Sequence, residues 1–354
     1  MSKVLKRQWV LSLATALIAT LLAPMQAQAQ PAFIQVEATQ WGYTVAGPNT
    51  SELQNPRPKV AHVEAKSKFI VNYKNFPEWA KKDFQSAVDV WSAHFSSSVP
   101  ITIDASWTRI SSSDVLGSAR PGDYFAGFNG APDSSLWYPS ALANALAGKD
   151  LDTRESEIVI QVNSLAEWND LNDGISYANQ YDLQSVFIHE MGHGLGFLST
   201  DSYDPFLGYG SIEEPTPFDA YAQVEDGRRL ADLPSPSLEL GKALTSPLVW
   251  AGALGTAANG GVKPLLYTPS RYEDGSSISH LDEATFGKSL LDNVMTPNLD
   301  AGEIFLGPGP LLLAMMEDMR RKPPVGIAVG TPQEVRNVTA LIAYTLSLHD
   351  ALPI

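Results

Sequence analysis

Alternating apolar and polar residues predict three strands in the first half of the chain. These are FIVNY, which begins at Phe69, ITIDASWTRI at 101–110, and EIVIQVN at 157–163. A repeat of two residues is typical of strands with one buried face. A helix is predicted after the first strand, opened by Pro77. Its apolar positions share one face: Ala80, Phe84, Ala87, Val88 and Trp91.

Two histidines fall near these elements. His94 lies on the apolar face of the predicted helix, and His62 precedes the first strand. A single histidine at helical spacing on an apolar face is more often packed in a core than bound to a metal. We therefore interpret both as structural residues.

The composition of the sequence and its periodicity change after residue 200. Residues 201–270 are rich in Pro and Gly and contain only short helical pieces such as LELGKALTS. We interpret them as an insertion between two halves of one unit, 65–200 and 271–322. A last apolar helix, PLLLAMMEDMR, precedes a linker over 323–343. Strands, one long helix and further helices together favour an α+β fold.

Both ends of the chain carry segments that we exclude from the fold. Residues 1–29 have a basic start, a short apolar run and a final Ala-Gln-Ala, which predicts a signal peptide cleaved after Ala29. A membrane anchor is the alternative, but the apolar run is shorter than such an anchor needs. Residues 30–64 lack clear periodicity and are expected to be a leader or a short pro-segment. Residues 344–354, YTLSLHDALPI, match the translation of a common sequencing adapter, so we expect a non-native tail.

Composition narrows the classes of function. The chain has 354 residues, a formal net charge of -15 and 44% hydrophobic residues, which is typical of a globular protein. This acidity argues against a nucleic-acid partner, because a phosphate backbone is bound by clustered Lys and Arg. The chain contains no cysteine, which excludes disulfides, thiolate metal sites and latency through a cysteine. Beyond the signal region no apolar run is long enough to span a membrane.

The strongest motif is HEMGH at 189–193. Asp182 is a plausible N-cap for a helix through this segment. His189 and His193, four residues apart, then share one helix face and can bind the same zinc ion. Glu190 lies beside that face, where a carboxylate can take a proton from a metal-activated water and pass it to a departing amine. Gly196, soon after the motif, predicts a turn at the end of the helix.

Two histidines do not complete a catalytic zinc site, and the sequence leaves several candidates for the third ligand. Ser199 lies six residues after His193, but a neutral hydroxyl is a poor zinc ligand. Glu213 has the spacing of thermolysin-like enzymes, although Pro215 and Pro217 argue against the helix that carries their glutamate. Asp219 has suitable chemistry without a supporting pattern. His280, in GSSISHLDEATF, is followed by Met295 in DNVMTPNLD.

The combination of HEMGHGLGF, a long insertion, a distant histidine and a later methionine resembles the leishmanolysin-type branch of the metzincins, from about Phe69 to Met319. The resemblance implies two lobes within a catalytic domain at 65–322. It also implies that His189, His193 and His280 are zinc ligands, that Glu190 is the general base, and that Met295 forms the methionine turn. The chain departs from the eukaryotic members in lacking cysteine.

These features predict a secreted or periplasmic zinc endopeptidase that acts on proteins or peptides. Two alternatives stay open: a gluzincin-type protease with Glu213 as third ligand, and a non-catalytic zinc-binding or adhesion module. Glu190 speaks against the second, because a purely structural site is normally closed by four protein ligands and has no use for a base. The oligomeric state is left open.

Overall fold

The structure is a computed structural model that describes residues 33–50, 64–169, 175 and 177–323. The expected signal peptide, His62 and the expected tail lie outside these residues, as does the expected linker apart from Pro323. Helices and strands are mixed throughout, and the described part contains eight α-helices and several sheets without a barrel. The mixed helix-and-strand architecture expected from the sequence is thereby confirmed.

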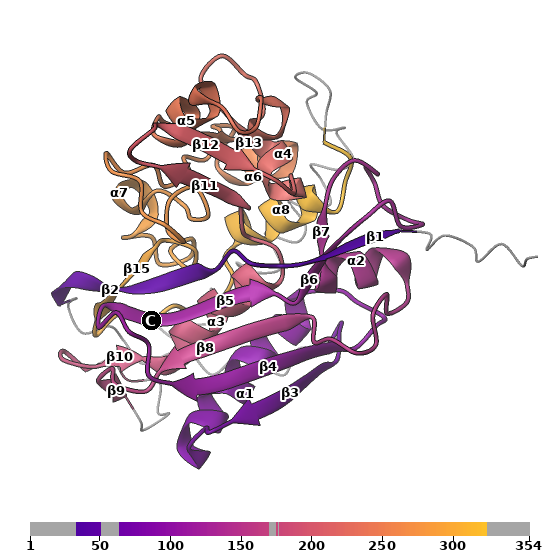
Figure 1. The fold of residues 1–354 in the computed structure, drawn as a ribbon. Helices are drawn as coiled ribbons and strands as arrows, with labels where there is room; N and C mark the ends of the chain where they lie inside the picture. The colour runs from indigo at the N-terminus through magenta and orange to yellow at the C-terminus, as the bar shows by residue number, and fades with distance from the viewer. Residues whose placement is uncertain (1–32, 51–63, 170–174, 176, 324–354) are drawn as a thin grey trace, which may run out of the picture. The chain divides into compact units, whose positions relative to one another are not determined.

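A six-stranded sheet forms the centre of the fold (Figure 1). Its order is β15-β2-β5-β8-β4-β3. The strands are β2 (Gly42–Thr50), β3 (Phe69–Lys74), β4 (Ile101–Thr108), β5 (Val115–Pro121), β8 (Ile158–Asn163) and β15 (Asn298–Ala301). The strands β3, β4 and β8 run parallel, whereas β5 is antiparallel to both of its neighbours. The three strands predicted from alternation are β3, β4 and β8.

Two helices pack together beside this sheet, α1 (Glu78–His94) and α3 (Leu183–Gly194). The ring centroids of Phe84 and Phe187 are 4.5 Å apart, and the indole of Trp91 donates to the carbonyl of Ile188 at 2.9 Å. The apolar face predicted for α1 is buried. His94 is half-buried at the end of α1, where its ring contacts the carbonyl of Val90 at 2.7 Å.

Short elements make up the rest of the described chain. Before α3 they are β1 (Ile34–Glu37), β6 (Asp123–Ala126), β7 (Tyr138–Pro139), α2 (Ser140–Ala147), β9 (Trp168–Asn169) and β10 (Tyr181–Asp182). After α3 they are β11 (Asp201–Asp204), β12 (Tyr209–Ile212), α4 (Pro217–Tyr221), β13 (Ala222–Gln223), η1 (Leu230–Asp232), α5 (Leu238–Leu244), β14 (Val249–Trp250), α6 (Ala253–Ala258), α7 (Glu283–Phe286) and α8 (Pro310–Met319).

Helix α8, the last helix of the described residues, is hydrogen-bonded to the segment interpreted as an insertion. The buried carboxylate of Asp318 accepts hydrogen bonds from the indole of Trp250 at 3.0 Å and from the backbone of Leu254 and Gly255 at 3.0 and 2.9 Å. Trp250 is fully buried among the core residues. Residues 201–270 therefore share a core with the chain that follows them.

The expected leader requires a correction, because part of it belongs to the fold. Residues 34–37 form β1, which pairs with β6, and residues 42–50 form β2, which lies between β5 and β15. In Figure 1 the indigo strand β2 runs beside the magenta strand β5. The alternation in this segment is short and is interrupted by Gly47 and Pro48, so the strand was not predicted.

Candidate metal centre

Helix α3 carries the HEMGH motif, and local contacts mark where the helix starts and where the chain turns after it. The side chain of Asp182 caps the helix by accepting from the backbone of Ser185 at 2.8 Å, as expected for an N-cap. The chain turns at Gly196, whose φ of 119° is open to glycine but strained for other residues. A Cβ at Gly194 would lie 2.3 Å from a methyl carbon of Ile158, so this glycine lets α3 approach β8 closely.

The two histidines of the HEMGH motif and His280 from a distant loop meet at one point. The Nε2 atoms of His189 and His193 are 3.0 Å apart, and that of His280 lies 3.2 Å from the first and 3.1 Å from the second. All three side chains are fully buried. Ligands at ~2.1 Å from one tetrahedral ion are about 3.4 Å from each other. The group can therefore hold a single metal ion.

The second ring nitrogen of each histidine faces a backbone carbonyl. Nδ1 of His189 lies 2.6 Å from the carbonyl oxygen of Val294. Nδ1 of His193 lies 2.8 Å from that of Phe197, and Nδ1 of His280 lies 2.7 Å from that of Ser276. A carbonyl only accepts, so each Nδ1 carries the proton and each Nε2 is left with a lone pair. Three lone pairs directed at one buried point repel each other unless a cation lies between them. The donor set thus fits a metal ion.

Met295 lies under the same helix. It is fully buried, and a Cβ at Gly192 would lie 2.6 Å from its sulfur. The backbone of Leu281 donates to the carbonyl of Met295 at 2.7 Å. The segment around Met295 therefore supports the residue after His280, while its neighbour Val294 orients His189.

Glu190 adjoins the histidines and has one oxygen without a partner. Its Oε1 accepts from the backbone and the hydroxyl of Thr44 at 3.0 and 2.6 Å. Its Oε2 is buried without a hydrogen bond among the described residues. Burial raises the pKa of Glu190 to about 8, although both bonds from Thr44 lower it. A divalent cation held by the histidines would lower this pKa by attraction.

Burial has the opposite effect on the histidines. It lowers the pKa of His193 to about 4 and holds the pKa values of His189 and His280 well below the ordinary range. Repulsion from neighbouring rings adds to the effect at His189 and His280. The rings are therefore neutral near pH 7, the state in which imidazole binds metal.

The other candidates for the third ligand lie elsewhere. Ser199 donates to Asp219 at 2.5 Å, and Asp219 also accepts from the backbone of Thr216 in the capping box of α4. Glu213 is exposed after β12 and is not part of the metal-binding group. Among the described residues His280, and not Glu213, lies within metal-binding reach of His189 and His193.

Thr44 was not predicted as a site residue. It falls in the segment expected to be a leader, yet it is the hydrogen-bond partner of Glu190. A signal was present in residues 41–46, WGYTVA, where Trp, Tyr and Val alternate with smaller residues. This repeat of two is short, and Gly47 and Pro48 follow it directly.

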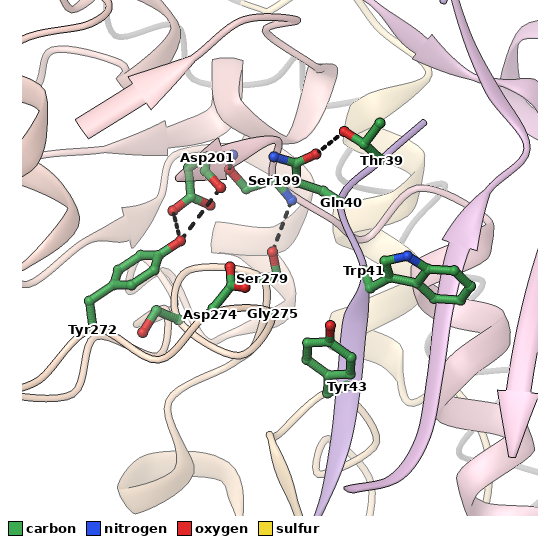
Figure 2. A pocket seen from close by; sticks show the side chains of 11 residues that line it. Thr39, Gln40, Trp41, Tyr43, Ser199, Asp201, Tyr272, Asp274, Gly275 and Ser279 are labelled. Atoms are coloured by element: carbon green, nitrogen blue, oxygen red, sulfur yellow. Dashed lines mark hydrogen bonds between the residues drawn. The ribbon is translucent and has the colours of Figure 1, made fainter. Parts of the chain in front are cut away.

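A polar cavity of about 200 Å³ is lined in part by Ser279, the residue before His280 (Figure 2). One wall includes Thr39, Gln40, Trp41 and Tyr43, and the opposite wall includes Asp201 and Tyr272. The hydroxyl of Tyr272 donates to the buried carboxylate of Asp201 at 2.8 Å. Burial raises the pKa of Asp201 to about 7. The two sides of the cavity meet where the backbone of Tyr43 donates to the carbonyl of Gly275 at 3.2 Å.

Comparisons with protein-family models, with curated proteins and with solved structures found no match. No helix in the described part of the chain combines the length and apolar character that crossing a bilayer requires. A function for the chain is therefore inferred from the candidate metal centre.

Proposed function

We propose that the chain is an exported zinc endopeptidase with a two-lobed, metzincin-like catalytic domain over residues 65–322. The observation that carries the proposal is the convergence of three Nε2 atoms at 3.0–3.2 Å, next to a glutamate with an unpartnered buried oxygen. Three protein ligands leave one coordination position open, which is the pattern of catalytic zinc sites. His189, His193 and His280 would hold the ion.

Zinc is the proposed ion because of the ligand type. Three neutral imidazoles without carboxylate or thiolate suit zinc, and a three-histidine set with an open position is a known catalytic arrangement for it. When bound, zinc supplies Lewis-acid chemistry, which lowers the pKa of a water and polarises a carbonyl.

Glu190 is the proposed proton carrier. It is not one of the converging ligands, and its Oε2 is free to accept a proton from a water. The same oxygen can then donate that proton to the departing amine. Thr44 fixes the other oxygen, so the carboxylate has a defined orientation.

A non-catalytic zinc module is the second candidate, and the burial of the site favours it. The four side chains at 189, 190, 193 and 280 are all fully buried, so a substrate has no direct access to them in this conformation. The ligand count favours the enzyme, because a structural zinc site normally has four protein ligands. Burying an ionisable carboxyl such as that of Glu190 also costs folding free energy, and a non-catalytic zinc site has no use for it.

Proteolysis separates the two candidates. Zinc-loaded protein is assayed for casein hydrolysis. Because the site is buried, the protein is tested both intact and after treatment with trypsin, which is then stopped with a serine-protease inhibitor. We expect chelator-sensitive hydrolysis by the treated protein and none by an equally treated Glu190→Ala variant. Zinc binding by both proteins without any hydrolysis would support the non-catalytic module.

A further inference from the structure

Strand β2 is one of the segments that cover the metal centre. Three successive residues of this strand each face a different site residue. A Cβ at Gly42 would lie 2.4 Å from the ring of His193, so the backbone passes directly over that ring. The backbone of Tyr43 lies within hydrogen-bonding reach of the His280 ring. Thr44 donates twice to Glu190.

Strand β2 is held over the centre mainly by its backbone. Gly42 and Thr44 lie opposite Ala119 and Gly117 of the antiparallel strand β5. A Cβ at Gly117 would lie 2.9 Å from Oε1 of Glu190, so β5 itself runs along the active-site helix. An extended chain paired with β5 in this register must therefore cross the metal centre.

The contacts of β2 extend beyond β5, because it also pairs with β15 and the backbone of Tyr43 donates to the carbonyl of Gly275 at 3.2 Å. The residues with side chains on the site face are small, Gly42 and Thr44, whereas the partly buried side chains of Trp41, Tyr43 and Val45 alternate with them along the strand. Thr39, Gln40, Trp41 and Tyr43 line the polar cavity across from Asp201 and Tyr272 (Figure 2). Residues 42–44 therefore cover the site with backbone and small side chains and not with bulky apolar groups.

We propose that strand β2 is a built-in inhibitory segment, in which residues 42–44 fill the path of a substrate backbone and Thr44 binds the general base Glu190. The proposal rests on the proposed peptidase function. The two hydrogen bonds of Thr44 occupy one carboxylate oxygen, and the backbone at 42–43 covers the histidine rings. The chain has no cysteine, so a thiolate cannot block its metal, and here backbone and hydroxyl groups serve instead.

Substitutions at Thr44 in the full chain test the proposal. Thr44→Pro removes both donors to Glu190 and strains the strand, whereas Thr44→Ser keeps both donors and serves as the matched control. The first readout is the rate at which a chromogenic chelator removes zinc, which does not depend on activity. We expect Thr44→Pro to lose zinc about tenfold faster or more, since one hydrogen bond to a charged group alone contributes roughly that factor.

A second measurement covers the case in which Thr44→Pro folds poorly. A fluorescently labelled peptide of residues 33–50 is titrated against wild-type protein treated with trypsin as above, and binding is followed by anisotropy. We expect saturable binding, inhibition of casein hydrolysis, and weaker binding by the same peptide carrying Thr44→Pro. A Thr44→Pro peptide that binds and inhibits as well as the natural one would overturn the proposal.

The outcomes distinguish this proposal from the peptidase assignment. Equal zinc release and equal hydrolysis by folded wild type, Thr44→Ser and Thr44→Pro would overturn the inhibitory role and leave the peptidase standing. Faster zinc release from Thr44→Pro without hydrolysis by any form would support β2 as the cover of the metal and overturn the peptidase.

Discussion

The Nε2 atom of His280 lies 3.1 Å from that of His193, although the two residues are 87 positions apart in the chain. His193 is on α3, whereas His280 is in the loop before α7. Closing a loop of this length adds only a logarithmic entropy cost, so the separation is no obstacle once both parts have folded. The metal centre is complete only when the segments on both sides of residues 201–270 have packed together.

Glu190→Ala, made in the Thr44→Pro background, should retain zinc and lose peptide hydrolysis. The change removes a proton acceptor but no metal ligand, and a general base contributes about 10²–10⁴-fold in rate. Zinc content and the turnover of a quenched fluorescent peptide are measured on the same samples. Turnover within a factor of about two of the Thr44→Pro parent would show that Glu190 is not the base.

Met295→Ala should destabilise the protein by about 2–5 kcal/mol, because it leaves a cavity beside Gly192 in the core. Met295→Leu nearly conserves the volume and should cost less than about 1.5 kcal/mol. Urea unfolding measures both values. If the two variants lost the same stability and both lost zinc, the role of Met295 would be more than packing.

Ionisation of Glu303 should lower the free energy of unfolding as pH rises from 4.5 to about 7. Burial raises its pKa from 4.5 to about 7 in the folded state, although bonds from the backbone of Asp300 and from Asn293 lower it. Below pH 4.5 the group is protonated in both states and costs nothing. Above its folded pKa it carries a buried charge, which costs about 3 kcal/mol at about 1.36 kcal/mol per pKa unit.

The control for this effect is Glu303→Gln, which does not titrate. Unfolding free energies of both proteins are compared at several values between pH 4 and pH 8. The difference between them should change by about 3 kcal/mol in favour of the variant as pH rises. A difference that stays constant with pH would contradict the raised pKa.

The metal centre was partly predictable, because the helix that carries two of its histidines is specified by residues close together in the chain. Spacing within 189–193 places two histidines on one face, and Asp182 and Gly196 mark the start of the helix and the turn after it through local backbone chemistry. His280 was different, because no periodicity links it to α3, and only the resemblance singled it out. Its position depends on long-range packing of the Met295 segment.

Strand β2 shows why the rest could not be predicted. It lies between β5 and β15, but its alternation of large and small residues covers only 41–46 and is interrupted by Gly47 and Pro48. The bond from Thr44 to Glu190 spans 146 positions. Neither hydropathy nor spacing reports a contact of that kind.

The most direct test of the account is the metal content of folded protein after dialysis, compared between wild type and three variants. We expect about one zinc ion per chain in wild type, Ser199→Ala and Glu213→Ala, and loss of most of it in His280→Ala, because only His280 completes the ligand set. Circular dichroism verifies that all four proteins are folded. Wild-type zinc content in His280→Ala, with zinc lost from Glu213→Ala or Ser199→Ala instead, would contradict the three-histidine centre.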